Sequence, residues 1–324
     1  MTVHVPILVE PIVQAMIEAL QALPEGTPPH WVVDCTFGGG GHTDAFLKAI
    51  AAEPKIAHHK VLGVDQDESA VSRGHERFAK EISGDRLKIV HRRFSELSEE
   101  DLAGRSVAYL LADLGFSSDQ LEDSERGLSF QSNGPLDMRL DPSRGVSCRD
   151  YLFNVTEQEL VEILQNLGEE RFSRRIAHAI ISKRRESAMP KTTRELADLI
   201  VHSVPPEARR GRIHAATRTF QALRIVVNQE LEELDKLLSR VILFVRPGGR
   251  VAIISFHSLE DRKVKQTFKG ESDFEQLTKK PIEADEVEVS RNPRSRSAKL
   301  RIAERTIPGE PIRKSERKRM GKFS

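Results

Sequence analysis

Short apolar runs alternate with segments of helical periodicity over the first 115 residues of the chain. The apolar runs predict strands at Trp31–Cys35, Val61–Asp65, Leu87–His91 and Val107–Ala112. Helices are expected around them, at residues 11–20, 43–51 and 68–82. Short apolar strands bounded by helices are typical of a parallel, doubly wound sheet. This part of the sequence therefore predicts an α/β fold.

The pattern changes after Gly115. Residues 115–154 show little periodicity, and apolar residues then recur at helical spacing over residues 156–202. Two capping-box patterns are present, Thr156 with Glu159 and Thr192 with Glu195. The α/β pattern resumes with one long helix over 215–243 and strands at 250–256, 274–278 and 299–305. We expect a sheet domain (1–115 and 212–310), a mainly helical insertion (116–211) and a basic C-terminal tail (311–324).

Composition and charge exclude several classes of protein. The chain has 50 Lys and Arg against 49 Asp and Glu, so its net charge of +1 creates no global attraction for nucleic acid. Its two cysteines, Cys35 and Cys148, are far apart and offer neither a disulfide framework nor a zinc cluster. No apolar stretch approaches the roughly 18 residues that span a membrane, and no signal-peptide pattern is present. We expect a cytoplasmic protein without a metal site.

Four consecutive glycines, Gly38–Gly41, follow the first expected strand and its acidic residue Asp34. Glycines at such a strand-to-helix turn let the backbone approach a ligand closely. The dinucleotide fingerprint fails because Thr43 or Asp44 stands where its third glycine belongs, and the Lys of a Walker A loop is missing. An acid before the glycines suits a ligand with a cationic amino-acid end, such as S-adenosylmethionine.

Two further acids end later strands. Asp65 ends the second strand, where a carboxylate can accept both hydroxyls of an adenosine ribose. Asp113 ends the fourth strand, where it either accepts a hydrogen bond from a nucleobase amine and stabilises the charge growing on nitrogen, or holds the cofactor. Carbon-5 methylation of cytosine needs a cysteine nucleophile. Neither Cys35 nor Cys148 ends a strand facing the cofactor, which favours nitrogen or oxygen as the acceptor.

Basic and aromatic residues later in the chain indicate contact with RNA. Arg218 opens the long helix, and Arg294 and Arg296 lie in a basic turn, where they can reach phosphates. His257 follows the fifth strand and can line a base pocket. A purely structural role is the alternative for each of them.

In their joint order these motifs resemble the bacterial small-subunit ribosomal RNA cytosine N4-methyltransferases, the methyltransferase H or MraW family. The resemblance covers nearly the whole chain, and only their combination is highly specific. One departure is Gly39, which stands where Arg or Lys is common in the family. The matching segments are His4–Leu8, Asp34–Thr43, Asp113–Gln120, Glu125–Phe130, Gly134–Arg139, Gly168–Phe172, Ala216–Ala222, Ser255–Arg262 and Asn292–Arg305.

The resemblance implies a class I (Rossmann-like) S-adenosylmethionine-dependent methyltransferase sheet with an inserted helical domain. It implies N4-methylation of a cytidine in the decoding region of 16S ribosomal RNA, either free or in the assembled small subunit. A homodimer formed through the helical insertion is a further expectation. Arg139 joins the RNA-contact candidates, and the implied cofactor contacts are Gly40, Gly41, His42, Thr43, Asp65, Phe94, Asp113 and Gln120.

Two rival functions are weaker. A methyltransferase acting on DNA amines usually carries Pro-Pro-Tyr or Pro-Pro-Trp where this chain has Asp113–Phe116, and a small-molecule methyltransferase is the related alternative. A non-catalytic RNA-binding protein on the same scaffold would not need an intact glycine turn together with Asp65 and Asp113.

Overall fold

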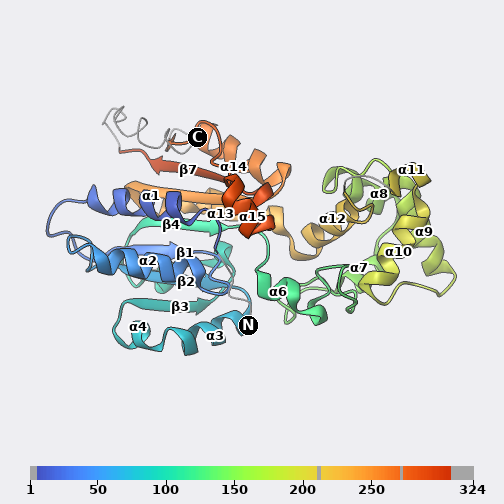
Figure 1. The fold of residues 1–324 in the computed structure, drawn as a ribbon, viewed down its shortest axis with the longest axis horizontal. Helices are drawn as coiled ribbons and strands as arrows, with labels where there is room; N and C mark the ends of the chain where they lie inside the picture. The colour runs from blue at the N-terminus through green and yellow to red at the C-terminus, as the bar shows by residue number, and fades with distance from the viewer. Residues whose placement is uncertain (1–5, 210–212, 271–272, 308–324) are drawn as a thin grey trace. The chain divides into compact units, whose positions relative to one another are not determined.

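The computed structural model describes residues 6–209, 213–270 and 273–307 (Figure 1). Contacts between residues divide the chain into two compact units. We call residues 1–115 with 232–324 the sheet unit and residues 116–231 the helical unit. The first boundary follows Gly115. The second lies 20 residues beyond the expected residue 211, because the helix over 217–228 packs against other helices of the insertion.

The sheet unit contains a seven-stranded sheet in the order β3-β2-β1-β4-β5-β7-β6. Strands β1 to β5 are parallel, and β7 is antiparallel to both β5 and β6. The strand order reverses between β1 and β4, so the carboxyl ends of these strands border the crevice in which such sheets bind ligands. The α/β prediction is confirmed. The strands are β1 Trp31–Asp34, β2 Lys60–Asp65, β3 Leu87–His91, β4 Val107–Asp113, β5 Val245–Ser255, β6 Phe274–Gln276 and β7 Lys299–Arg305.

Helices cover both faces of this sheet (Figure 1). Helices α1 (Val9–Gln21), α2 (Gly41–Ala52) and α3 (Glu68–Arg77) pack on one face. Helices α5 (Glu99–Leu102), α13 (Glu230–Phe244) and α14 (Ser258–Gly270) pack on the other. Both cores are apolar because each central strand is buried on both sides. The shorter helices are α4 Ala79–Ser83, η1 Phe94–Glu96, α15 Glu286–Arg291 and η3 Pro293–Ser297.

A buried arginine ties helix α1 to the sheet. The Arg250 side chain on β5 is only 1% exposed. Its Nη1 donates to Glu18 Oε2 of α1 at 2.8 Å, and its Nε donates to Glu304 Oε2 of β7 at 3.1 Å. A guanidinium held by two carboxylates fixes three elements relative to one another.

We expect Arg250→Ala to lower the free energy of unfolding by about 3 kcal/mol, because removing one partner leaves half-buried carboxylates without their cation. Urea denaturation measures this loss. Arg262→Ala, an exposed arginine on α14, is the control and changes stability by less than about 0.5 kcal/mol. Equal stability of the two variants would contradict the anchoring role.

The helical unit is built on the helices that the sequence periodicity predicts. Leu160, Leu164, Ile176, Ile180 and Leu196 are fully buried in its core. No helix among the described residues of the chain is long and apolar enough to cross a membrane. The elements of this unit are α6 Ser118–Glu122, η2 Ser124–Arg126, α7 Cys148–Asn154, α8 Glu157–Asn166, α9 Ser173–Arg185, α10 Thr193–Ser203, α11 Pro206–Arg209 and α12 Thr217–Asn228.

One predicted capping box is complete and the other is half formed. Thr156 and Glu159 bond reciprocally at the start of α8. At α10, Thr192 accepts a hydrogen bond from Glu195 N, but the Glu195 carboxylate accepts from Lys191 N at 2.7 Å instead of from Thr192 N.

The prediction of a single long helix over 215–243 is wrong. The chain forms α12 and α13, which are separated by Gln229 in the left-handed conformation with φ 53°. Arg224 spans the break and holds both oxygens of Glu230 at 2.7 and 2.9 Å. Apolar positions continue at helical spacing on both sides, so the periodicity carries no sign of the break.

Candidate functional site

The glycine turn joins β1 to α2 at the carboxyl edge of the sheet. Gly38 and Gly40 have φ 51° and 74°, in the left-handed region that glycine adopts without strain. Gly40 N donates to Phe37 O at 2.7 Å, and Asp44 N donates to Gly40 O at 2.9 Å. Gly41 starts α2, and a Cβ atom there would lie 3.1 Å from Pro6.

Phe37 anchors this turn, a role that sequence reasoning missed. A Cβ atom on Gly63 of β2 would lie 2.7 Å from the Phe37 ring, and one on Gly74 of α3 would lie 2.6 Å from it. Phe78 packs edge-on against the same ring, with centroids 5.9 Å apart. Two distant glycines thus leave room for Phe37, and the isolated glycine in the second predicted strand was the available signal.

We expect Gly40→Ala to destabilise the protein and to weaken S-adenosylmethionine binding. The added Cβ needs a left-handed alanine and would lie 2.6 Å from Phe78 and 2.9 Å from Phe37. Gly26→Ala is a matched control, because Gly26 has φ 78° and nothing within 4 Å of its Cβ position. It bears only the backbone strain of about 1–2 kcal/mol. Thermal unfolding and calorimetric titration should show the larger loss at Gly40; equal losses would contradict the account.

Asp34 is completely buried below the turn. Its carboxylate accepts hydrogen bonds from Thr43 Oγ1 at 2.8 Å and Thr36 N at 3.2 Å. Burial raises the pKa of Asp34 to about 6, against the opposing effect of these hydrogen bonds. Thr43, a predicted cofactor residue, therefore fixes the turn through Asp34.

Asp65 ends β2 and also holds the turn. Its Oδ2 accepts from Gly38 N at 2.6 Å, and its Oδ1 accepts from Asp67 N at 2.8 Å. Burial raises the pKa of Asp65 to about 6. An ionised carboxylate offers about four lone-pair positions, so two remain for the hydroxyls of a ligand. Binding of the ribose by Asp65 stays a prediction.

Asp113 ends β4 beside His42. Asp113 Oδ2 lies 3.9 Å from His42 Nδ1, while Asp113 Oδ1 is buried without a hydrogen-bond partner among the described residues. Burial, together with the carboxylates of Asp34 and Glu260, raises the pKa of Asp113 to about 8. This carboxyl group lacks the stabilisation that an anion needs in a buried position.

The neutral side chain of His42 lies between Asp113 and Ile7 of the N-terminal segment. Its side chain is 4% exposed, and burial lowers its pKa to about 4. Its Nε2 lies 2.9 Å from Ile7 O, so Nε2 carries the hydrogen and donates it. The Nδ1 lone pair then faces Asp113.

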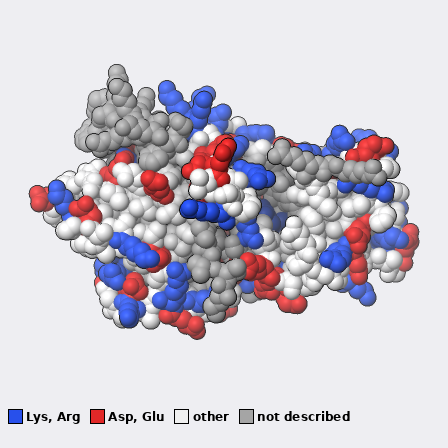
Figure 2. Space-filling view, viewed as in Figure 1, with Lys and Arg blue, Asp and Glu red and all other residues white. Residues whose placement is uncertain are grey.

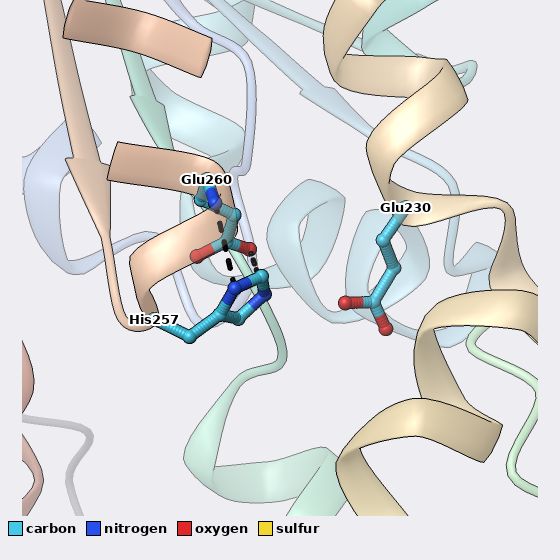
Figure 3. A group of neighbouring side chains, drawn as sticks. All are labelled: Glu230, His257 and Glu260. Atoms are coloured by element: carbon cyan, nitrogen blue, oxygen red, sulfur yellow. Dashed lines mark hydrogen bonds and ion pairs between the residues drawn. The ribbon is translucent and has the colours of Figure 1, made fainter. Parts of the chain in front are cut away.

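His257 and Glu260 follow β5 and interact at the start of α14 (Figure 3). His257 Nε2 lies 3.2 Å from Glu260 Oε1, and Glu260 N donates to His257 Nδ1 at 3.4 Å. Glu260 Oε2 also accepts from Phe256 N at 2.9 Å. Sequence reasoning named His257 but missed Glu260, although an acid in the first turn of the helix after that strand was the available signal.

The carboxyl ends of β1 and β4 and the first turn of α14 thus carry three acids, Asp34, Asp113 and Glu260, and repulsion from Asp34 and Glu260 contributes to the raised pKa of Asp113. The charged groups that shift the pKa of Asp113 are carboxylates, with no contribution from Arg or Lys. A positively charged ligand would relieve this repulsion. The glycine turn admits such a ligand closely, so the residues present fit a cationic cofactor.

Phe94 and Gln120 are the two remaining predicted cofactor residues. Phe94 starts η1 after β3, and its half-buried ring packs on the core of that sheet face. Gln120 belongs to the helical unit, where its Oε1 accepts from Ser117 N at 2.9 Å and completes a capping box with Ser117. Contact of either residue with the cofactor stays a prediction.

The predicted RNA contacts divide between the units. In the helical unit, Arg139 holds both oxygens of Asp137, at 2.8 and 2.7 Å, and Arg218 Nη1 donates to Glu169 O at 2.9 Å. In the sheet unit, Arg294 and Arg296 flank the buried Ser295 in η3, and His257 is paired as described. Binding of RNA by these five residues stays a prediction.

Cys35 and Cys148 are buried, and burial raises the pKa of both thiols. A nucleophilic thiolate is disfavoured at both positions, which supports the exclusion of a covalent cysteine mechanism. Basic and acidic side chains are interspersed over the face shown in Figure 2. The first two residues of the N-terminal motif, His4 and Val5, and the basic tail at 311–324 lie outside the described residues.

The chain is similar to known proteins over most of its length. The model of the MraW methylase family matches residues 1–306. "Ribosomal RNA small subunit methyltransferase H" of a Synechococcus species is 47% identical over 284 residues, 85% of each chain. The protein of that name in Prochlorococcus marinus is 42% identical over 95% of this chain and 96% of its own. The solved structure of an rRNA methylase from Streptococcus thermophilus aligns with a TM-score of 0.42 and 10% identity, over 93% of this chain and 100% of that one.

Proposed function

The chain belongs to the MraW methylase family, and from this premise we propose that it methylates N4 of a cytidine in the decoding region of 16S ribosomal RNA. It is an S-adenosylmethionine-dependent rRNA methyltransferase with a class I fold. The names of its relatives support the small subunit as the source of the substrate.

The observation that carries the proposal is the buried Asp113 carboxyl group near the glycine turn, whose Oδ1 has no hydrogen-bond partner among the described residues. Bound S-adenosylmethionine supplies a methyl group on a positively charged sulfur. The charged groups that shift the pKa of Asp113 are the carboxylates of Asp34 and Glu260, and no Arg or Lys is among them. A cationic ligand would therefore meet negative charge at this position. Asp65 keeps acceptor positions for the ribose, and Gly40 brings the backbone close to the ligand.

Asp113 is the residue assigned to the acceptor amine. In its ionised form Asp113 accepts a hydrogen bond from the exocyclic N–H, which favours the pyramidal, nucleophilic geometry of nitrogen. As the C–N bond forms and the bond between the methyl carbon and sulfur breaks, the carboxylate stabilises the positive charge that develops on nitrogen, and a proton then leaves this nitrogen. His42 donates to Ile7 O and turns only a lone pair toward Asp113, so it leaves this carboxylate available. Positioning and electrostatics are the main contributions of the protein.

The substrate is ribosomal RNA, either free or assembled in the small subunit. Since small subunits assemble in the cytoplasm, the proposal places the protein there. A homodimer through the helical unit remains part of the proposal, and light scattering of the purified protein tests it.

The decisive experiment uses small subunits from cells that lack this methyltransferase activity. The purified protein is incubated with isotope-labelled S-adenosylmethionine and, separately, with subunits, naked rRNA or DNA. Mass spectrometry of nuclease digests should find one N4-methylcytidine in the decoding region. Label in DNA would favour the DNA methyltransferase, and label at carbon 5 or a ribose hydroxyl would contradict the N4 assignment. Absence of transfer together with absence of cofactor binding would favour the non-catalytic RNA-binding protein.

A further inference from the structure

Two helices of the helical unit, α9 and α12, carry arginines in their first turns without an acid beside them. Arg174 and Arg175 lie in the first turn of α9, three and four residues after Arg171, and Arg218 lies in the first turn of α12. Neither first turn contains an acid. By contrast, first turns of neighbouring helices contain Asp119, Asp150, Glu157 and Glu195.

Arginines in these first turns lower the stability of both helices. The amino end of a helix carries partial positive charge, and a cation placed there is unfavourable by about 0.3–1 kcal/mol. The N-cap residues Phe172 and Ala216 form no side-chain capping bond. The arginines are therefore not explained by the folding of α9 and α12.

The two amino ends lie together. Arg218 Nη1 donates to Glu169 O in the loop that leads into α9, at 2.9 Å. A Cβ atom on Gly168 would lie 2.6 Å from Arg218 O, so this loop contacts the first turn of α12 closely. Helix α8 packs against both α9 and α12 (Figure 1). The four arginines consequently gather on one part of the helical unit, which we call the arginine patch: Arg171, Arg174, Arg175 and Arg218.

The patch is exposed and carries excess positive charge. All four side chains are exposed, and none forms an ion pair with an acid among the described residues. Arg171 lies over the Phe172 ring, with its Cζ 4.5 Å from the ring centroid. Two acids adjoin the patch: the buried Glu170, whose carboxylate accepts from Phe172 N, and the exposed Glu169. The patch therefore has four cations beside two acids, and one of these acids, Glu170, already accepts a hydrogen bond from the backbone.

We propose that the arginine patch binds the phosphate backbone of the RNA substrate, an inference that rests on the proposed function. A guanidinium presents a planar fork of donors that matches phosphate geometry. Phosphate bound there would also offset the unfavourable charge at two helix amino ends. RNA is favoured over an acidic protein surface because four guanidinium groups without a carboxylate partner on one part of the helical unit suit a dense row of phosphates.

The double variant Arg174→Gln/Arg175→Gln tests the proposal, with Arg185→Gln at the opposite end of α9 as matched control. Arg185 lies 4.0 Å from Glu157 and sits in the last turn, where a cation is favourable. Binding to small subunits and to naked rRNA is measured at several salt concentrations, together with thermal unfolding and S-adenosylmethionine affinity. We expect the double variant to bind RNA about tenfold or more weakly, with a log–log salt slope reduced by about 1 to 2.

The same double variant should unfold at an equal or higher temperature and bind the cofactor normally, whereas the control keeps RNA affinity and loses a little stability. A purely structural role would reduce stability and leave the salt slope unchanged, which would overturn the proposal. Weaker binding to subunits with unchanged binding to naked rRNA would indicate an acidic protein partner and would also overturn it. If the wild-type protein methylates rRNA while the double variant binds normally, only the patch is refuted. If the wild-type protein neither binds nor methylates rRNA, the proposed function fails with it.

Discussion

Asp113→Asn should lower the single-turnover rate of methyl transfer to small subunits by about 10³-fold, within the range of a lost general base or charge-stabilising group. The amide is nearly isosteric with the carboxyl group but cannot carry the negative charge that the developing cation on nitrogen requires. Quenched-flow measurement with saturating labelled cofactor isolates this step from binding. Asp44→Asn is the control, because Asp44 lies in the first turn of α2 and pairs with Lys48 at 2.7 Å. A rate within threefold of wild type would remove Asp113 from the mechanism.

The same substitution should change how stability depends on pH. The pKa of Asp113 is raised to about 8 in the folded protein, above the ordinary value of 3.8. Its stabilising contribution is therefore fully present below about pH 4 and is lost as the pH rises through about 8. Asparagine stays neutral, so the unfolding temperature of the variant should rise relative to that of wild type as the pH increases from about 4 to about 8. A constant difference across this range would show that Asp113 is not a strained buried acid.

S-adenosylmethionine should bind about twentyfold more tightly at about pH 7.5 than at about pH 6. With a pKa of about 8, Asp113 is almost entirely protonated at the lower pH, and a cation favours its ionised form. Binding must therefore release a proton. The ligand amine is still mostly charged at about pH 7.5, because an ordinary α-amino group has a pKa near 8. Isothermal titration in two buffers of different ionisation enthalpy measures both the affinity and the released proton.

The controls separate Asp113 from its neighbours. Asp34 and Asp65, whose pKa values are both raised to about 6 by burial, add a smaller dependence near the lower pH. His42 stays neutral throughout, since burial lowers its pKa to about 4. Asp113→Asn should keep only the smaller dependence. S-adenosylhomocysteine, which lacks the charge on sulfur, should show a weaker pH effect than the methyl donor. Identical curves for the two ligands would contradict charge recognition by this site.

The sheet and its glycine turn are predictable from the sequence because their determinants are local. A strand buried on both sides reads as an apolar run, and Gly38 and Gly40 stand where the backbone turns left-handed. The break at Gln229 leaves no such mark, because glutamine gives no signal of a left-handed backbone and apolar spacing continues past it. For the same reason the sequence does not show that α12 belongs to the helical unit, because α12 and α13 look like one continuous helix.

The sequence indicates which acids end strands at the candidate site, but it does not show their pKa values or which charged side chains pair with one another. Strand-end positions identify Asp65 and Asp113, yet the high pKa of Asp113 depends on burial and on Glu260, which lies 147 positions later in the chain. Likewise, Arg139 looks like a free cation in the sequence, whereas the structure pairs it with Asp137. Long-range packing decides which charged residues remain available to a ligand.

The most direct test of the account is a crystal structure of the full chain with S-adenosylmethionine bound. The account predicts the ribose hydroxyls within hydrogen-bond distance of the Asp65 carboxylate, the backbone of Gly40 against the ligand, and a cationic centre facing Asp113. A ligand bound away from the carboxyl ends of β1, β2 and β4, or held with its charge remote from Asp113, would contradict it.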